Sequence, residues 1–247
     1  MKKLLFIIFY FSYITIFAQK IVIFRSDNNN YRPLNKSDRV FFFDSDTIKN
    51  DSNTVLTYIQ LKIFGKKSTF QEDTYGLIRL SELAHKKVRE MGYNGVSMNY
   101  YKKIENSDTL SLNFYKLNQN FYQKLSDEPI KKNLTLINPD YNKPKDISID
   151  NKDFVIENGY YYSIKIDADY SKIKLGSGLL SSHNKISFKE KLNHYYLIDG
   201  YSTTPAPGGM IGFGISPPTI HTIGKIAGEI ITRIYKKYTP KESINSK

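Results

Sequence analysis

The residues of this 247-residue chain that are best suited to chemistry lie between positions 194 and 221. This segment combines histidine, tyrosine and aspartate side chains with a loop rich in proline and glycine. Long loops inside compact domains often carry binding and catalytic residues. The candidate interaction surface consists of His194, Tyr201, Met210, Phe213 and His221. The simpler alternative is that the apolar residues of the segment cover the edge of a core.

Acid–base chemistry in this segment requires a histidine and a carboxylate that converge in the fold. His194 and Asp199 are the pair that the sequence offers, and a hydrolase that uses them is one hypothesis. It requires both side chains to meet in one cleft. The chain has 24 acidic residues, so the sequence does not single out a facing carboxylate pair of the glycosidase type.

Sequence motifs for nucleotide binding and nucleophilic catalysis fail at fixed positions. A phosphate-binding loop needs a glycine five residues before the second glycine and a hydroxyl residue after the lysine. The Gly-Lys pair at 224–225 has Thr219 and Ile226 at those places. A nucleophile elbow has the pattern Gly-x-Ser-x-Gly. Gly95 and Ser97 match its first two fixed positions, but Asn99 replaces the last glycine. The sequence therefore predicts no catalytic residue and no nucleotide ligand.

Possible metal ligands are scattered along the chain. The four histidines are His85, His183, His194 and His221, and there is no cysteine. Asp44 and Asp46 form one carboxylate pair, and Asp167 and Asp169 form another. Each pair would share one face of a strand and could hold a hard cation, but no calcium-loop pattern surrounds either pair. Turn or edge-strand residues are the simpler interpretation, so we expect no metal site and no cofactor.

The first eighteen residues have the pattern of a cleaved secretory signal peptide. Lys2 and Lys3 precede a stretch of fifteen residues that ends at Ala18 and is apolar or aromatic except for one serine and one threonine. A membrane-spanning helix needs about 20 apolar residues, so an uncleaved anchor is the less favoured alternative. We expect export to the periplasm or to the outer surface of a bacterial cell. Without cysteine the chain forms no disulfide, and its stability depends on its core.

The charge of the chain bears on its partners. The formal net charge is +12, but the lysines occur as scattered pairs rather than as one long run. No nucleic-acid-binding motif accompanies them, so we expect no nucleic acid partner. An envelope protein, a lipid or a polysaccharide is the expected partner, and the basic surface would permit peripheral contact with a membrane.

The first half of the mature chain, residues 19–117, is predicted to be a small α+β domain. Three short strands are expected at 20–25, 39–43 and 54–64. Apolar residues at helical spacing then predict a helix, with Gly92 placed to end it. These residues are Leu80, Leu83, Ala84, Val88 and Met91. Alternating residues over 96–114 predict a strand hairpin.

The second half is expected to be rich in strands. Residues 118–145 contain three prolines and predict a linker. Residues 146–238 are predicted to form a β-sandwich-like domain, with an Asn-Gly hairpin turn at 158–159. An amphipathic helix is expected to close this domain over residues 219–238, and residues 239–247 are expected to form a tail.

Two stretches resemble known modules. Residues 54–117, with Gly-Tyr-Asn-Gly-Val at 92–96, resemble a module of small exported bacterial envelope proteins. Residues 147–201, with Asn-Gly-Tyr-Tyr at 158–161 and a late Tyr-Tyr strand, are similar to small β-sandwich domains of the PEGA-like kind. The resemblance implies an envelope protein and transfers no active-site residue.

These observations favour an exported, non-enzymatic protein that binds or interacts with a component of the cell envelope. A periplasmic hydrolase with a dispersed His/Asp site is one alternative. Another is a protein that associates with the envelope surface through its apolar Pro/Gly loop and its basic C-terminal helix.

Overall fold

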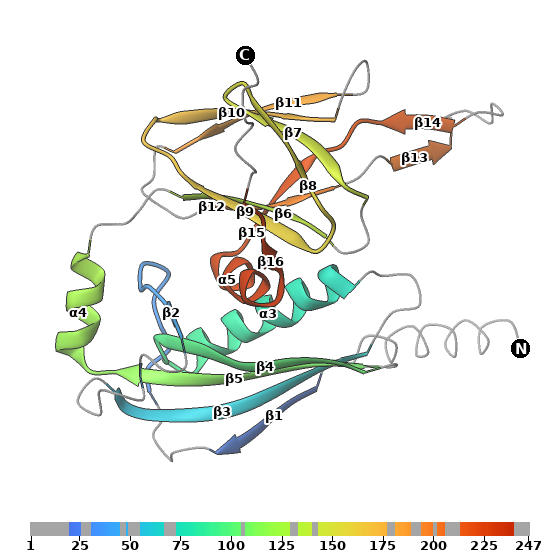
Figure 1. The fold of residues 1–247 in the computed structure, drawn as a ribbon. Coiled ribbons are helices and arrows are strands. Elements are labelled where there is room, and N and C mark those ends of the chain that lie inside the picture. The colour runs from blue at the N-terminus through green and yellow to red at the C-terminus, as the bar shows by residue number, and fades with distance from the viewer. Residues whose placement is uncertain are drawn as a thin grey trace, which may run out of the picture. The chain divides into compact units, whose positions relative to one another are not determined.

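The chain has a mixed α+β fold, mostly of strands, in a computed structural model (Figure 1). The structure describes residues 20–25, 31–44, 48, 55–66, 73–104, 107–128, 133–139, 143–176, 181–188, 194–199, 202–205 and 213–239. The predicted signal peptide and the residues after 239 lie outside the described residues. Two compact units divide the chain, unit 1 at Met1–Glu128 and unit 2 at Pro129–Lys247.

Unit 1 is built on a five-stranded sheet with the order β1-β3-β5-β4-β2. The strands are β1 (Lys20–Arg25), β2 (Phe41–Phe43), β3 (Val55–Lys66), β4 (Gly95–Ile104) and β5 (Ser107–Leu117). All neighbours are antiparallel except β2 and β4. One face is buried beneath α3 (Asp73–Glu90) (Figure 1). On this face the fully buried Ile59, Leu61 and Ile63 of β3 pair with apolar residues of β5.

Helix α3 confirms the helix predicted from the apolar stripe. Leu80, Ala84 and Val88 are buried, as the spacing of three and four residues requires. Gly92 has a φ of 75°, the left-handed conformation that ends helices, and its N–H donates to the Arg89 carbonyl. A Cβ at this position would lie 2.4 Å from the Arg32 carbonyl oxygen, so only glycine fits here.

The other face of this sheet is partly covered by α4 (Gln119–Asp127). Phe121, Tyr122 and Leu125 of this helix pack against Phe41, Phe43, Tyr115 and Leu117 of the sheet in a second apolar cluster. The side chain of Asn118 caps the helix by accepting a hydrogen bond from the Asn120 N–H.

The linker predicted over residues 118–145 therefore needs correction. It contains α4 and also β6 (Asn133–Asn138), whose residues from Leu134 onward are all buried. The prolines misled the interpretation because Pro139 and Pro144 lie between strands and interrupt neither β6 nor β7 (Lys145–Ile149).

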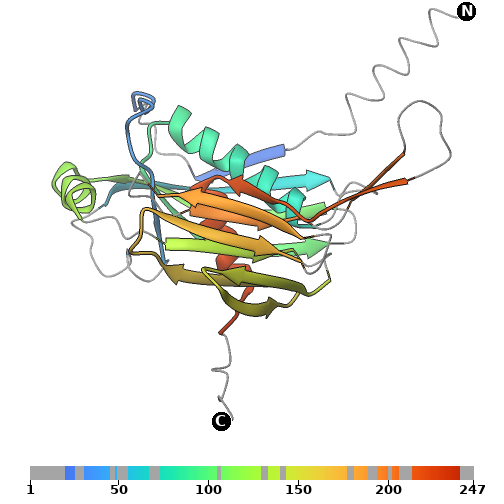
Figure 2. The same ribbon diagram turned by 90° about the horizontal axis from the view of Figure 1, so that it is seen from above.

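Unit 2 contains two larger sheets, seen from above in Figure 2. One has the order β11-β10-β7-β8, and the other has the order β15-β12-β6-β9-β16. Their remaining strands are β8 (Lys152–Ile156), β9 (Tyr160–Lys165), β10 (Tyr170–Leu175), β11 (Ser182–Ser187), β12 (His194–Ile198), β15 (Ile220–Ile223) and β16 (Lys236–Lys237). One apolar core joins buried residues of both sheets, including Leu136 of β6, Ile147 of β7 and Ile173 of β10.

The Asn-Gly dipeptide at 158–159 does not form the predicted hairpin. Gly159 has the expected positive φ of 73°, but β8 pairs with β7 whereas β9 pairs with β6. The chain therefore crosses between sheets at this turn. The hairpin lies one turn earlier, where Asp150 and Asn151 have φ values of 48° and 70°, as a two-residue type I′ turn requires.

The predicted C-terminal helix over 219–238 is too long. The structure has β15, then α5 (Lys225–Ile234), then β16. Gly224 has an extended backbone and forms the N-terminal cap of α5, which ends the strand and begins the helix. Ile220 and Thr222 are β-branched and pair with β12, so sheet pairing prevails over the helical spacing of the isoleucines.

Candidate functional site

The structure describes only part of the predicted interaction surface. His194 begins β12, and His221 lies in β15 opposite Leu197. Phe213 begins β14 (Phe213–Ser216), which pairs with β13 (Ser202–Pro205). Tyr201 and Met210 lie outside the described residues. None of the described contacts brings the two histidines together.

His194 is an aromatic packing residue in this fold. Its ring lies 5.2 Å from the Phe188 ring in an edge-to-face arrangement and 6.3 Å from the Tyr196 ring, nearly parallel to it. Its Nε2 atom is buried and has no hydrogen-bond partner. Phe188 and Tyr196 also belong to the core between the two sheets, so His194 extends that core.

Asp199 pairs with His221 rather than with His194. The Asp199 Oδ2 atom lies 3.4 Å from His221 Nε2, and the Thr219 hydroxyl lies 3.1 Å from the same nitrogen. A nucleophilic relay requires the acid and the hydroxyl on opposite ring nitrogens. His194 and Asp199 stand at the two ends of β12, about 16 Å apart along an extended strand. The pair proposed for a hydrolase therefore does not converge.

Lys145 completes the surroundings of Asp199. Lys145 is buried and is the first residue of β7. Burial lowers the pKa of Lys145, and the charge of Asp199 opposes that shift. Asp199 therefore has a histidine on one side and a buried ammonium group within electrostatic range. This arrangement is a structural charge cluster near one end of β12.

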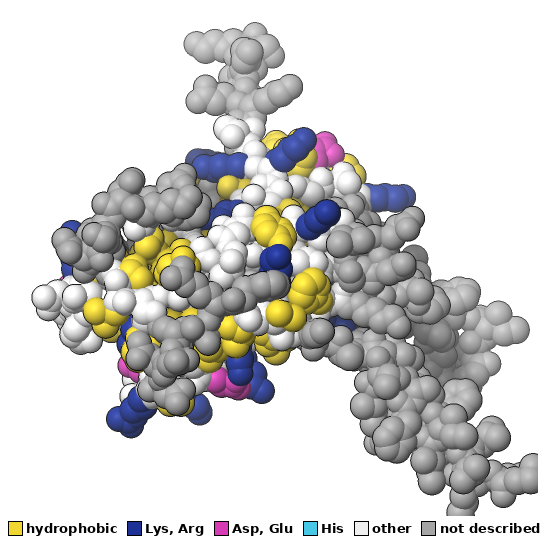
Figure 3. All heavy atoms as spheres, turned by 90° about the horizontal axis from the view of Figure 1, so that it is seen from below, with side chains coloured by type: hydrophobic (Ala, Val, Ile, Leu, Met, Phe, Trp, Pro, Cys, Tyr) yellow, Lys and Arg dark blue, Asp and Glu magenta, His cyan; other side chains and the backbone are white. Residues whose placement is uncertain are grey.

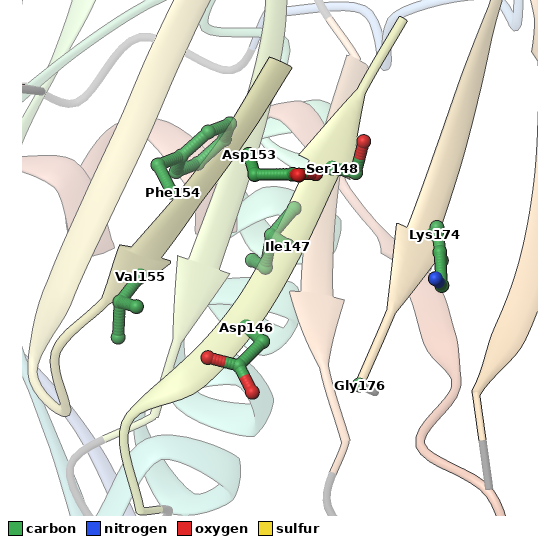
Figure 4. Close-up of a pocket in the computed structure, with 8 residues that line it drawn as sticks. All are labelled: Asp146, Ile147, Ser148, Asp153, Phe154, Val155, Lys174 and Gly176. Atoms are coloured by element: carbon green, nitrogen blue, oxygen red, sulfur yellow. The ribbon is translucent and has the colours of Figure 1, made fainter. Parts of the chain in front are cut away.

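A recess lies elsewhere, on the outer face of the four-stranded sheet (Figure 4). We call it the sheet hollow. Its volume is about 390 Å³. Its lining residues are Asp146, Ile147, Ser148, Asp153, Phe154, Val155, Lys174 and Gly176. None of these residues belongs to the segment 194–221.

Strand alternation positions the polar groups of the sheet hollow. Ile147 and Ile149 point into the core, so Asp146 and Ser148 point outward. Ser148 pairs with Asp153 on β8 and with Lys174 on β10, which places the three in one cross-strand row. Figure 4 shows the Asp153 carboxylate extending toward Ser148.

The row places opposite charges on either side of a hydroxyl. Because neighbouring strands lie about 4.8 Å apart, the backbones of Asp153 and Lys174 are separated by about 10 Å. That separation leaves room for a small polar group between an acceptor and a donor. The exposed Val155 adds an apolar wall. The sheet hollow can therefore bind a polar ligand that offers both a donor and an acceptor.

Sequence reasoning missed the sheet hollow, although a signal was present. The alternation of Ile147 and Ile149 with polar residues predicts an outward polar row on this strand. The partners of Ser148 on β8 and β10 can be identified only once the strand pairing is known. The hairpin predicted at 158–159 gave a different pairing for β8.

Comparisons with protein families, curated proteins and solved structures find no match to this chain. Among the described residues no group of three or more histidine, aspartate or glutamate side chains is arranged to hold a metal ion. The described helices are too short or too polar to cross a membrane.

Proposed function

We propose that this chain is an exported, non-enzymatic protein that binds a component of the bacterial cell envelope. The observation that carries the proposal is the sheet hollow, an open recess that offers Asp153, Ser148 and Lys174 in one row. A recess with a few convergent polar groups suits the binding of a polar ligand.

Export is supported by the sequence of the first eighteen residues. The positive pair at residues 2–3 and the short apolar stretch that ends at Ala18 suit secretion followed by cleavage. The absence of cysteine from the chain suits a fold that depends on its core alone.

A β-sandwich architecture for unit 2 is part of the same proposal. Its support is the apolar core that contains residues of both sheets, such as Leu134 of β6 and Leu175 of β10. In such an architecture one face of each sheet is buried and the other is free to present polar residues. The sheet hollow lies on an outward face of this kind.

The test is cosedimentation of the purified full chain with envelopes of the bacterium that produces it. We expect the chain to sediment, and we expect the double variant Asp153→Ala/Lys174→Ala to lose most of this binding. The matched control is Lys165→Ala/Asp167→Ala, which removes an exposed pair, 3.0 Å apart, from outside the sheet hollow.

Two outcomes would overturn the proposal. One is recovery of the native protein from the cytosol with Met1 intact, as read by mass spectrometry. The other is turnover of an ester or glycan library at enzyme-like rates, above about 1 per second. Equal binding by the two double variants would remove the sheet hollow as the binding site.

A further inference from the structure

Beyond the part that α4 covers, the outer face of the unit 1 sheet carries exposed side chains among the described residues. Side chains alternate along a strand, and Ile59, Leu61 and Ile63 are buried on the α3 side, so positions 58, 60 and 62 point the other way. We call the outward surface formed by six residues of β3, β4 and β5 the open face. These residues are Tyr58, Lys62, Asn99, Tyr100, Lys102 and Asn113.

An amide pair lies at the centre of the open face and is held rigidly. Asn99 Nδ2 donates to Asn113 Oδ1 at 2.8 Å, and Asn113 Nδ2 donates to Asn99 Oδ1 at 2.9 Å. Asn113 Nδ2 also lies 3.1 Å from the Tyr115 hydroxyl, which shares a hydrogen bond with Ser97. An amide oxygen has two lone pairs, so the exposed Asn99 can still accept a hydrogen bond from a ligand hydroxyl.

Two partly exposed aromatic rings flank the amide pair. Tyr58 and Tyr100 are each 40 % exposed. Their partners on β5 are Tyr115 and Ser111, four residues apart, so strand geometry places the Cα atoms of the two tyrosines about 17 Å apart. That distance exceeds one sugar ring and suits an extended chain. Aromatic rings supply large, rigid contact area together with a polar tip.

The open face is basic. Lys62 lies 5.8 Å from the Tyr100 ring centre, and the exposed Lys102 lies on the same side. Among the described residues of β3, β4 and β5 that point this way, none is acidic. Asp108 has the opposite orientation, near Gly76 of α3. The charge of the open face is therefore complementary to an anionic ligand.

We infer that the open face of unit 1 binds an acidic polysaccharide. In this complex the tyrosine rings contact the faces of sugar rings, and Asn99 of the amide pair accepts hydrogen bonds from sugar hydroxyls. Lys62 and Lys102 bind the carboxylates of the polymer. Figure 3 shows the molecule from this side, where yellow apolar or tyrosine side chains are interspersed with white polar ones.

Two other anionic partners fit the open face less well. The apolar interior of a membrane would strip water from the amide pair without supplying hydrogen bonds in return. Single-stranded nucleic acid also combines stacking with negative charge, and it is disfavoured by the proposed export of the chain. The choice of a polysaccharide over nucleic acid is the one step that depends on the proposed function.

The experiment is affinity electrophoresis of the purified full chain through gels that contain polygalacturonate, with dextran as the neutral polymer. We expect retardation by polygalacturonate only. The double variant Tyr58→Ala/Tyr100→Ala is expected to raise the dissociation constant about tenfold, whereas Tyr58→Phe/Tyr100→Phe retains binding. Tyr170→Ala is the matched control, because Tyr170 is a 46 % exposed tyrosine of unit 2.

Charge is tested in parallel with a matched pair of lysine variants. Lys62→Ala/Lys102→Ala is expected to weaken binding and to reduce its dependence on salt. Lys236→Ala/Lys237→Ala removes the same charge from two exposed residues of unit 2 and is expected to leave binding unchanged. Equal losses in the two double variants would overturn the inference, because net charge alone would then explain binding.

Two further outcomes would also overturn the inference. One is passage through polygalacturonate gels without retardation. The other is tighter binding to poly(dT) or to phosphatidylglycerol vesicles than to polygalacturonate, lost in the Tyr58→Ala/Tyr100→Ala variant. These results are distinct from a failure of the proposed function. An intact Met1 in the cytosol, or an Asp153→Ala/Lys174→Ala variant that still sediments with envelopes, would leave the gel measurement unchanged.

Discussion

The Tyr195 hydroxyl donates a hydrogen bond to Glu229 Oε1 at 2.8 Å, and this contact joins β12 to α5. Glu229 Oε2 also lies 3.2 Å from Arg233 Nη1, one turn further along the helix. Burial first, and then the Glu229 charge, raise the pKa of Tyr195 far above its ordinary value. Tyr195 therefore stays protonated at neutral pH and can donate this hydrogen bond.

Replacing Tyr195 with phenylalanine is expected to lower the free energy of unfolding by about 2 kcal/mol, since hydrogen bonds to charged acceptors contribute about 1.5–3 kcal/mol. Urea unfolding followed by circular dichroism would measure the loss. Tyr170→Phe, at an exposed position, is the control and is expected to change stability by less than about 0.5 kcal/mol. Equal effects at the two positions would show that the Tyr195–Glu229 contact does not stabilise unit 2.

Gly228→Ala is expected to destabilise unit 2, against the usual preference of helices for alanine. Alanine in a helix interior normally gains about 1 kcal/mol over glycine. At this position, however, a Cβ would lie 2.1 Å from Cγ of the Tyr195 ring, which is itself buried. Overpacking of this kind costs about 1–3 kcal/mol, so the melting temperature should fall.

The control for Gly228→Ala lies at the start of the same helix. A Cβ at Gly224 meets no atom within 4 Å, and its φ of −61° suits any residue. Gly224→Ala is therefore expected to lower the free energy of unfolding less than Gly228→Ala does. Its only cost is the weaker helix-capping ability of alanine. The reverse order would contradict the close approach of α5 to β12.

Local sequence patterns predict those helices and turns that depend on contacts between residues close together in the sequence. Helix α3 follows from its apolar stripe, and the left-handed Gly92 terminates it just after Glu90, because both features depend on local sequence alone. The turn at 158–159 was misassigned, since an Asn-Gly turn looks the same whether it joins paired strands or two sheets. The sheet hollow was missed for the same reason, because Ser148 meets Lys174 only through strand pairing.

His85 makes the stability of unit 1 depend on pH. Burial first, and then the charge of Arg89, lower the pKa of His85 below 6.5. The folded state therefore binds a proton at His85 less readily than the unfolded state does. The stability that neutral His85 contributes is fully present above pH 6.5, and it is lost as pH falls through the lowered pKa of the folded state. Urea titrations across pH 5 to 8 are expected to show a steeper acid loss in the native chain than in His85→Gln.

The matched control is His183→Gln, at an exposed position of β11. Its stability profile is expected to follow that of the native chain. A His85→Gln profile parallel to the native one would show that His85 does not couple folding to protonation.

Asp199→Asn is expected to lower the pKa of Lys145 further. Burial already lowers the pKa of Lys145 from 10.5, and the Asp199 charge partly opposes this shift, so removing the charge leaves desolvation unopposed. The lysine Cε chemical shift, followed by NMR as pH is raised, would report the change. His221→Asn is the control, because it removes the side chain 3.4 Å from Asp199 while the Asp199 charge stays, so the Lys145 pKa should not change. An unchanged Lys145 pKa in Asp199→Asn would show that the Asp199 charge does not act on Lys145.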